Sequence, residues 1–351
     1  MAKLGMPTVV VKFIEAGIEA IQRSQRGIVA LILEDTKQVI DKLATKTNGH
    51  EVLPNPFLVY TVDDIPEELS DKNKDYILKA LKGYNKPPLK VVVYMMQQGG
   101  EKAGADRFQE PLKAMLTERF DYLAIPTIET AQLEYVATWV KTARENKFKK
   151  IKVVLPGSNA DYEGVINFGN TKVVTADREY KAAEYTARIA GLVAGTNMTQ
   201  SATYAPLTEV IDCDRHTQDE MDTMVNEGKF FIWYDGEKFK MSRAMNSLVT
   251  TSQGKLEGYQ TIKIVDIMDM IYDDIRKTAQ DSYIGKYTND YENKCLLISA
   301  ILGYFKQLEN ERLLQKDYST CEIDCEAVRT YQLSHGLFTK EELAKMSDDE
   351  V

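Results

Sequence analysis

Two serines and three histidines are the side chains of this sequence that could supply the nucleophile and the base of a hydrolase. A serine hydrolase needs a serine hydroxyl held by an imidazole, which is itself oriented by a carboxylate. The candidate nucleophiles are Ser158 and Ser201, and the candidate bases are His50, His216 and His335. Neither serine lies in a Gly-x-Ser-x-Gly stretch between a strand and a helix. The sequence therefore predicts no catalytic triad, and we expect no enzymatic activity.

The segment GTNMTQS at residues 195–201 has the order of a protease active site with one residue changed. Subtilisin-type serine proteases carry their nucleophile in a Gly-Thr-Ser-Met stretch, and Asn197 occupies the serine position here. An asparagine side chain cannot ionise to attack a carbonyl. Gly191 and Gly195 are four residues apart on a predicted helix, a spacing that lets a second backbone approach closely. We interpret the segment as a packing motif that ends in an uncharged polar cap.

Three glycines stand where a nucleotide-binding loop would lie, after a predicted strand and before a predicted helix. The spacing of Gly99, Gly100 and Gly104 matches neither the dinucleotide fingerprint nor the phosphate loop that ends in Lys-Ser or Lys-Thr. An α/β hydrolase or a nucleotide-binding enzyme remains the alternative function, and it rests on these glycines and on residues 195–201 alone.

Acidic side chains recur on one face of a predicted helix towards the end of the chain. Asp266, Asp269 and Asp273 share that face, and Asp274 lies next to them. Such carboxylates can serve acid–base catalysis or bind a cation. We expect instead a solvated face or a charged contact with another subunit. A solvated helix end is likewise expected for the basic patch of Lys147, Lys149, Lys150 and Lys152.

The bulk composition excludes several kinds of partner and site. The 351 residues include 44 Lys and Arg and 53 Asp and Glu, which gives a net charge of −9. Duplex nucleic acid requires a basic face, so we expect no nucleic-acid binding. The four cysteines are too few for a disulfide scaffold, and Cys321 and Cys325 lack zinc-site spacing, so we expect no metal and no cofactor. No apolar stretch is long enough for a signal peptide or a membrane span, which predicts cytoplasmic folding without membrane insertion.

Apolar runs and helical patterns alternate along the first two thirds of the chain. The strand-like runs are nearly continuous in apolar residues, as is typical of parallel strands covered on both faces. We therefore predict a parallel sheet with helices on both sides. Strands are expected at 27–35, 57–62, 89–96, 120–127 and 151–157, and helices at 70–83, 105–118, 130–146 and 179–196.

Beyond these elements the pattern changes to a hairpin and two long helices. Asp235 and Gly236 supply the positive φ angles of a two-residue turn within residues 230–243. Apolar residues then recur at helical spacing, which predicts a separate carboxy-terminal unit of amphipathic helices. They are Ile264, Ile267, Met268, Ile271 and Ile275 in the first helix and Ile298, Ile301, Leu302, Phe305 and Leu308 in the second.

The run RIAGLVAGTNMTQSATYAPLTEV begins a resemblance that extends over nearly the whole chain. It is followed by the acidic helix pattern TQDEMDTMVNEGK, the predicted hairpin, and SRAMNSLVT with Arg243 and Asn246. In this order the segments resemble the sheath proteins of contractile phage tails, most of all those of R-type, diffocin-like bacteriocins. The run IVDIMDMIYDDIRKTAQDSYIGKYTNDYENKCLLISAILGYFKQLE resembles the carboxy-terminal domain of the same family.

The resemblance implies an α/β plus α+β fold and a mechanical function. It implies a subtilisin-like, parallel-sheet middle domain without a catalytic triad, a sheath core domain and an N-terminal strand arm. The implied divisions are 1–20 for the arm, 21–88 for a small α/β part, 89–248 for the subtilisin-like domain and 249–351 for the core domain. The implied function is that of a structural subunit that polymerises in rings around a tail tube and contracts to drive the tube through a target cell envelope. The implied partners are further copies of the chain, the tail tube protein, and the baseplate and terminator proteins. The implied location is the cytoplasm during assembly and then a virion or a released tail-like particle.

An apolar strand is predicted ahead of all these domains. Within residues 8–15, Val9, Val11 and Phe13 share one strand face and Val10 lies on the other. An isolated strand of this composition leaves its backbone groups and apolar side chains unsatisfied, so it must pair. The resemblance favours pairing with a neighbouring subunit. Sheaths of this group continue into a carboxy-terminal strand, whereas this sequence ends in KEELAKMSDDEV, so we expect that strand to be missing from it.

Overall fold

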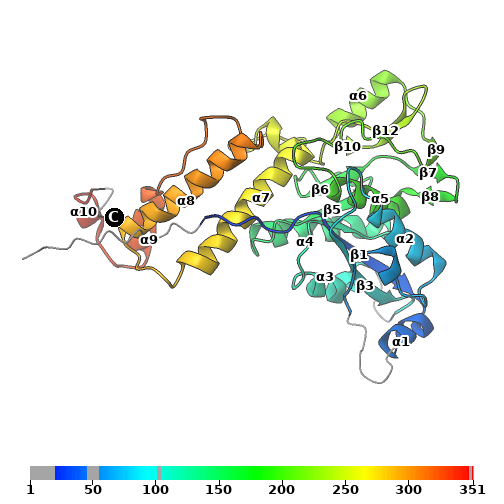
Figure 1. Cartoon of the computed structure of the whole chain (residues 1–351), viewed down its shortest axis with the longest axis horizontal. Helices are drawn as coiled ribbons and strands as arrows, with labels where there is room; N and C mark the ends of the chain where they lie inside the picture. Colours follow the sequence, from blue (N-terminus) through cyan, green and yellow to red (C-terminus); the bar gives the residue numbers. More distant parts are fainter. Residues whose placement is uncertain (1–19, 46–54, 101–103, 348–349, 351) are drawn as a thin grey trace, which may run out of the picture. The chain divides into compact units, whose positions relative to one another are not determined.

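The chain divides into two compact units. The computed structural model describes residues 20–45, 55–100, 104–347 and 350 (Figure 1). The α/β unit comprises Ser24–Asp273, and the helical unit comprises residues 20–23 together with the chain from Asp274 onward. The strand expected at residues 8–15 lies outside the described residues, and the four-part division expected from the resemblance stays a prediction.

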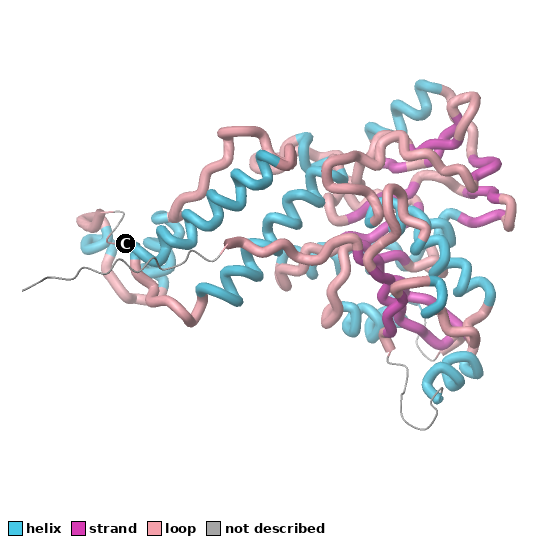
Figure 2. Tube along the Cα trace, viewed as in Figure 1, coloured by secondary structure: helices cyan, strands magenta, loops and turns pink. Residues whose placement is uncertain are grey.

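A seven-stranded sheet forms the centre of the α/β unit (Figure 2). Its strands lie in the order β10-β6-β5-β4-β1-β3-β2, and every neighbouring pair is parallel except β2 and β3. The predicted parallel sheet is therefore confirmed except at β2, which lies antiparallel to β3. The strands are β1 (Ile28–Asp35), β2 (Phe57–Val59), β3 (Lys90–Gln97), β4 (Tyr122–Ala124), β5 (Lys152–Pro156), β6 (Val165–Phe168) and β10 (Lys229–Phe230).

The central strand β1 explains why the apolar runs are continuous. Side chains of a strand point alternately to opposite faces of the sheet. Val29 and Leu31 join one hydrophobic core, and Ile28 and Ala30 join the other. Both sets are fully buried, because each face of the sheet is covered.

Helices cover both faces of the sheet. The core that contains Leu31 also receives side chains from α1 (Lys37–Thr45), α2 (Asp71–Leu81) and α5 (Ala182–Ala194). The opposite core receives side chains from α3 (Gln109–Met115) and α4 (Leu133–Glu145). Short 3-10 turns lie at Val62–Asp64, Gly104–Phe108, Thr130–Gln132 and Glu257–Gln260.

A small antiparallel sheet and a hairpin complete the α/β unit. In the small sheet, β7 (Lys172–Thr175) lies between β8 (Glu179–Lys181) and β9 (Val210–Cys213). The helix expected at 179–196 therefore begins later, because its first three residues form β8. The remaining elements are α6 (Gln218–Asn226) and the hairpin strands β11 (Ile232–Tyr234) and β12 (Phe239–Met241).

The hairpin turn lies one residue further along the chain than predicted. The N–H of Asp235 donates to the carbonyl oxygen of Lys238 at 3.1 Å, so Gly236 and Glu237 occupy the tip. Gly236 has a φ of 102°, a conformation that favours glycine. The Asp235 carboxylate accepts the N–H groups of Glu237 and Lys238 at 2.9 and 2.7 Å. Asp235 therefore closes the turn with its side chain, which it could not do from the tip.

The helical unit consists of α8 (Tyr291–Asn310), α9 (Cys325–Ser334), α10 (Lys340–Leu343) and the end of α7 (Ile262–Thr278). A π-helical turn at Ala279–Tyr283 follows α7. The N–H of Gln22 donates to the Thr278 hydroxyl at 3.0 Å, and the Tyr304 hydroxyl donates to Asp274 at 2.6 Å. Of the apolar residues predicted for α8, Ile301 and Leu308 are buried, whereas Leu302 is 37% exposed.

Helices α2 and α5 approach each other most closely at a glycine of α5. A Cβ atom built on Gly191 would lie 2.0 Å from the carbonyl oxygen of Ala80. A Cβ atom on Gly195 would lie 2.2 Å from the carbonyl oxygen of Lys86. Both distances are far shorter than any van der Waals contact, so α5 packs directly on the backbone of α2 and of the loop after it.

This contact predicts that Gly191→Ala destabilises the α/β unit by about 1–3 kcal/mol, because the added methyl overpacks the α2–α5 interface. Gly303→Ala in α8 is the matched control, since no atom lies within 4 Å of its Cβ position. The control should gain about 0.5–1 kcal/mol from helix propensity. Urea unfolding followed by circular dichroism measures both. If Gly191→Ala unfolds at the same urea concentration as the unchanged chain, α5 and α2 are not tightly packed.

Candidate functional site

The side chains that could have formed a hydrolase site are not brought together. The Ser201 hydroxyl lies 2.9 Å from the Thr203 hydroxyl, and Ser158 is buried. The His216 ring packs against Phe231, with the ring centroids 6.2 Å apart. Neither serine hydrogen-bonds to a histidine in the part of the chain that the structure describes, from which His50 is left out.

The end of α5 serves packing. Asn197 is exposed, and its N–H donates to the side-chain oxygen of Asn85 at 3.0 Å. The carbonyl oxygen of Gly195 accepts the N–H groups of Asn85 and Lys86, both at 3.2 Å. The segment is thus bonded to the loop after α2 through backbone groups, and its side chain at the would-be nucleophile position faces solvent.

The two family-motif residues after the hairpin have different environments. The Asn246 amide donates to the carbonyl oxygen of Tyr259 at 2.6 Å, and its side-chain oxygen accepts the N–H of Leu248 at 3.0 Å. Asn246 is buried and links two loop segments, whereas Arg243 is exposed.

The carboxyl edge of the parallel sheet is closed by an internal ion pair. In open α/β sheets, ligands bind outside the carboxyl ends of the strands. Glu34, near the end of β1, pairs there with Arg107 and accepts the Thr127 hydroxyl at 2.5 Å. The charge of Arg107, three residues after Gly104, is therefore already neutralised, which weakens the nucleotide-binding alternative.

The acidic face of α7 is directed into the α/β unit, where Asp269 is buried and Asp266 and Asp273 are half-buried, so the expectation of a solvated or intersubunit face is wrong. Asp269 is only 3% exposed and is held by two cations. Arg144 donates to both of its oxygens at 2.9 Å, and the Lys152 ammonium donates to Oδ2 at 2.7 Å. Asp274 is also buried, but it belongs to the helical unit.

Lys152 is the centre of this ion cluster. Its ammonium also pairs with Asp266 at 2.9 Å, and the Tyr122 hydroxyl donates a short hydrogen bond to the same carboxylate. Lys152 is 1% exposed at the start of β5. Its expected place in a solvated basic patch is therefore wrong, because the carboxylates of α7 compensate its charge in the interior.

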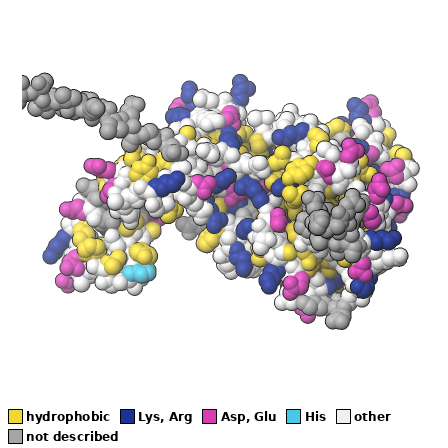
Figure 3. Space-filling model, turned by 60° about the horizontal axis from the view of Figure 1, so that its bottom comes forward, with side chains coloured by type: hydrophobic (Ala, Val, Ile, Leu, Met, Phe, Trp, Pro, Cys, Tyr) yellow, Lys and Arg dark blue, Asp and Glu magenta, His cyan; other side chains and the backbone are white. Residues whose placement is uncertain are grey.

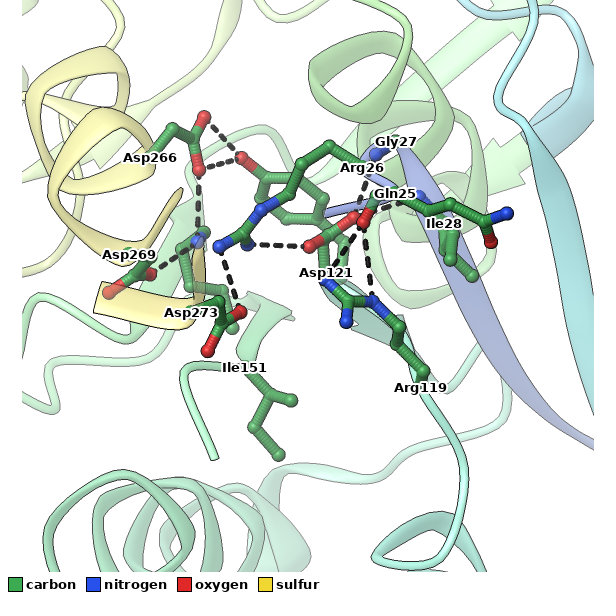
Figure 4. Close-up of polar contacts among 12 residues, drawn as sticks. Gln25, Arg26, Gly27, Ile28, Arg119, Asp121, Ile151, Asp266, Asp269 and Asp273 are labelled. Atoms are coloured by element: carbon green, nitrogen blue, oxygen red, sulfur yellow. Dashed lines mark hydrogen bonds and ion pairs between the residues drawn. The ribbon is translucent and has the colours of Figure 1, made fainter. Parts of the chain in front are cut away.

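Arg26 and Asp121 extend the cluster to the start of β1. Asp121 accepts the N–H groups of Gly27 and Ile28 at 2.7 and 2.9 Å and an Arg26 N–H at 2.7 Å. Arg26 also donates to Asp273 at 2.8 Å. Figure 4 shows these carboxylates pointing towards the cations from several different elements. We define the ion cluster as Arg26, Asp121, Tyr122, Arg144, Lys152, Asp266, Asp269 and Asp273.

The carboxylates of the ion cluster differ in their electrostatics. Burial alone would raise the pKa of Asp269, but the charges of Lys152 and Arg144 outweigh it, and the pKa is lowered. Burial does raise the pKa of Asp266, and Lys152 only partly offsets it. Burial likewise raises the pKa of Asp273. Four carboxylates share three cations, so the cluster carries an excess negative charge that Asp266 and Asp273 bear.

The ion cluster can hold elements together, and its geometry offers no reactive group. Its charged groups are engaged with one another, and no set of three or more His, Cys, Asp or Glu side chains within the described ranges could hold a metal ion. The cluster lies where β1, β4 and β5 begin, at the edge opposite to the one that binds ligands in such sheets. The arrangement anchors α7 on the sheet.

Comparison with known proteins identifies the family. The family description "Phage tail sheath protein central domain" matches residues 101–247, and "Phage tail sheath C-terminal domain" matches residues 255–341. The tail sheath protein of Clostridium phage phiCD119 is 33% identical over 352 residues, which cover 99% of this chain and 91% of that protein. The chain belongs to the phage tail sheath family. The family expected from the sequence is thus confirmed, and the sheath chain is a structural subunit of a contractile sheath.

Solved structures share the fold of the sheath chain. The sheath tail protein of Desulfitobacterium hafniense superposes with a TM-score of 0.68 at 19% identity, over 86% of the sheath chain and 89% of that protein. The helical sheath of the anti-feeding prophage in its contracted state gives 0.63 at 12% identity, over 88% and 84%. No helix among the described residues of the sheath chain is long and apolar enough to cross a bilayer.

The ion cluster predicts opposite outcomes for two amide substitutions in the sheath chain. Asp269→Asn leaves Arg144 and Lys152 without their shared carboxylate and should cost about 3–5 kcal/mol, the range for breaking a buried ion pair. Asp266→Asn is the matched control on the same helix. It removes the excess charge and keeps an acceptor for Tyr122, so it should change stability by about 1 kcal/mol or less. Chemical denaturation at pH 7 tests both, and equal losses would contradict this division of charge.

The pH dependence of the Asp269→Asn effect should follow from the lowered pKa of Asp269. A carboxylate whose folded pKa lies below its usual value of 3.8 stabilises the fold above that value and loses the effect as pH falls through the folded pKa. The stability difference between the sheath chain and Asp269→Asn should therefore be complete at pH 7 and shrink below about pH 4. Asp266, whose pKa is raised, contributes in the opposite sense. Denaturation series between pH 7 and pH 3 measure the trend, and a difference that grows on acidification would refute it.

Proposed function

We propose that this sheath subunit polymerises in rings around a tail tube and that the assembled sheath contracts to drive the tube through a target cell envelope. The support is the family membership over nearly the whole length, together with the fold shared with a helical sheath in its contracted state. Further copies of the chain, the tube protein, and baseplate and terminator proteins are its proposed partners. Assembly would take place in the cytoplasm, and the product would be a virion or a released tail-like particle.

The proposed role of the α/β unit is mechanical. We propose the subtilisin-like description for its parallel sheet, and with it the divisions at 21–88, 89–248 and 249–351. Support for a non-enzymatic role comes from the exposed Asn197 and from Ser158 and Ser201, neither of which hydrogen-bonds to a described histidine. The family itself is structural.

The proposed link between subunits is the strand expected at residues 8–15. A strand that adds to a neighbour's sheet contributes backbone hydrogen bonds, while alternate side chains give specificity. Val9, Val11 and Phe13 would supply one apolar face of this arm. It lies outside the described residues, and the proposal rests on the sequence pattern and the family.

Electron microscopy of the purified chain with its tube protein tests the proposed function. Rings or rods with a repeating subunit are the expected result. Val10→Pro and Val11→Pro should abolish them, because proline deletes a ladder donor and fixes φ. Lys3→Pro, outside the predicted strand, is the control and should assemble. A chain that shows no ordered assembly with its tube protein would sink the proposal, and normal rods from both valine variants would exclude the arm as the link.

A further inference from the structure

Helix α8 has a broad apolar surface, and among the described residues only one side of it is fully buried. The covered face consists of Ala300, Ile301, Tyr304 and Leu308, all of which are buried. The Tyr304 hydroxyl donates to Asp274, and the Arg23 guanidinium lies 5.5 Å from the centre of the Tyr304 ring. This face of α8 is therefore occupied by the end of α7 and by the segment that precedes β1.

The second face of α8 is an apolar stripe at the spacing of a helix–helix seam. We define the α8 stripe as Cys295, Ile298, Leu302 and Phe305, which recur at intervals of three, four and three residues. Leu302 is 37% exposed, and the other three are half-buried. This is the spacing at which a second helix packs along a seam. The α8 stripe adjoins the buried side chains of the same helix, and so wide an apolar surface is normally buried throughout.

A second apolar surface lies further along the same unit. We define the α9 ridge as Tyr331, Leu333, Leu337 and Phe338, which are 57%, 41%, 60% and 38% exposed. Helix α9 contains no buried residue. Figure 3 shows hydrophobic side chains (yellow) grouped at the molecular surface beside a histidine (cyan) at the left of the view. Neighbouring large apolar side chains in the open mark a surface that another protein covers.

We propose that the α9 ridge of a second copy of the chain docks on the α8 stripe. One chain presents both surfaces, and they differ from each other, so the contact is heterologous. Such head-to-tail contacts generate rings when the rotation between subunits closes and helical filaments when it does not. The proposed sheath function, on which this inference rests, requires assemblies of this kind. Pairing of the α8 stripe with itself would instead close a dimer and end growth.

The charges beside the α8 stripe suit a partner of the chain's own composition. Glu292 and Lys294 flank its first turn, and Lys306 lies beside its last residue. A border of both signs excludes a polyanion as the partner, because nucleic acid requires a basic surface. A net charge of −9 over the whole chain agrees with this. An apolar centre with a mixed, polar border is the usual composition of a protein–protein interface.

The native thiol of Cys295 reports directly on this contact. N-ethylmaleimide should modify Cys295 in dispersed chains and react about tenfold more slowly in rods of the chain alone, because interface centres exclude solvent. Cys213 is buried in the folded subunit and should stay unmodified in both states, which controls for unfolding. Peptide mass spectrometry reads both sites. A Cys295 that reacts equally fast in rods overturns the proposal, and protection that appears only when tube protein is added assigns the α8 stripe to the tube.

Charge variants test both sides of the contact. Leu302→Lys in the α8 stripe and Leu337→Lys in the α9 ridge should each prevent rod formation while leaving the circular dichroism spectrum unchanged. Leu256→Lys is the matched control, since Leu256 is 69% exposed on the other unit. It should assemble normally.

Mixing the two variants gives the sharpest test. Leu302→Lys keeps an intact α9 ridge, and Leu337→Lys keeps an intact α8 stripe. One molecule of each can therefore form a single contact, so an equimolar mixture should form discrete dimers, visible by analytical ultracentrifugation, and nothing longer. A mixture that stays monomeric, or single variants that assemble like the control, refutes the contact. The electron microscopy with tube protein uses the unchanged chain. If that chain forms rods but the mixture of variants forms no dimers, the proposed function stands and only this inference is refuted.

Discussion

A carboxylate that leaves water must meet a cation, and this requirement fixes the position of α7. Moving an isolated ionised carboxylate into an apolar interior costs far more than a folded domain can offset. Asp269 is placed against the sheet because Arg144 of α4 and Lys152 of β5 both reach it. The apolar cores can tolerate exchanges among side chains of similar volume, whereas each carboxylate of the ion cluster must lie against a cation. The sheet provides buried apolar surface, and the ion cluster determines where α7 lies against it.

The same sheet shows how polar groups at its two edges can serve structure without catalysis. At the carboxyl edge, Glu34 and Arg107 neutralise each other. At the opposite edge, Asp121 accepts backbone N–H groups from the start of β1 and so aligns that strand with β4. Many α/β enzymes keep such groups unpaired in a cleft, where their pKa values can be tuned. Here Glu34 and Asp121 are each held by an arginine, which leaves neither carboxylate free for chemistry.

The sequence predicted the elements whose signal is local. The run at 27–35 is apolar without interruption because β1 is covered on both faces, and Gly191 stands where two helix backbones meet, so both could be inferred from residue type and spacing. Lys152 could not be placed, because its burial depends on carboxylates more than a hundred residues away. The only signal for the burial of Lys152 is that the apolar run VVLP follows it and that aspartates recur later at intervals of three and four. The same pattern would fit a lysine and aspartates that are both exposed to solvent. The turn at Asp235 was misplaced by one residue because a carboxylate can replace a backbone acceptor, which spacing does not reveal.

Both ends of the seven-stranded sheet are unusually short. One terminal strand, β2, has three residues and the other, β10, has two, whereas β1 and β3 in the interior have eight each. A long exposed strand is a template that any passing chain can extend, and short ones offer few backbone groups to pair. Two copies of the chain are therefore poorly able to stack edge to edge through this sheet, however many copies stand side by side.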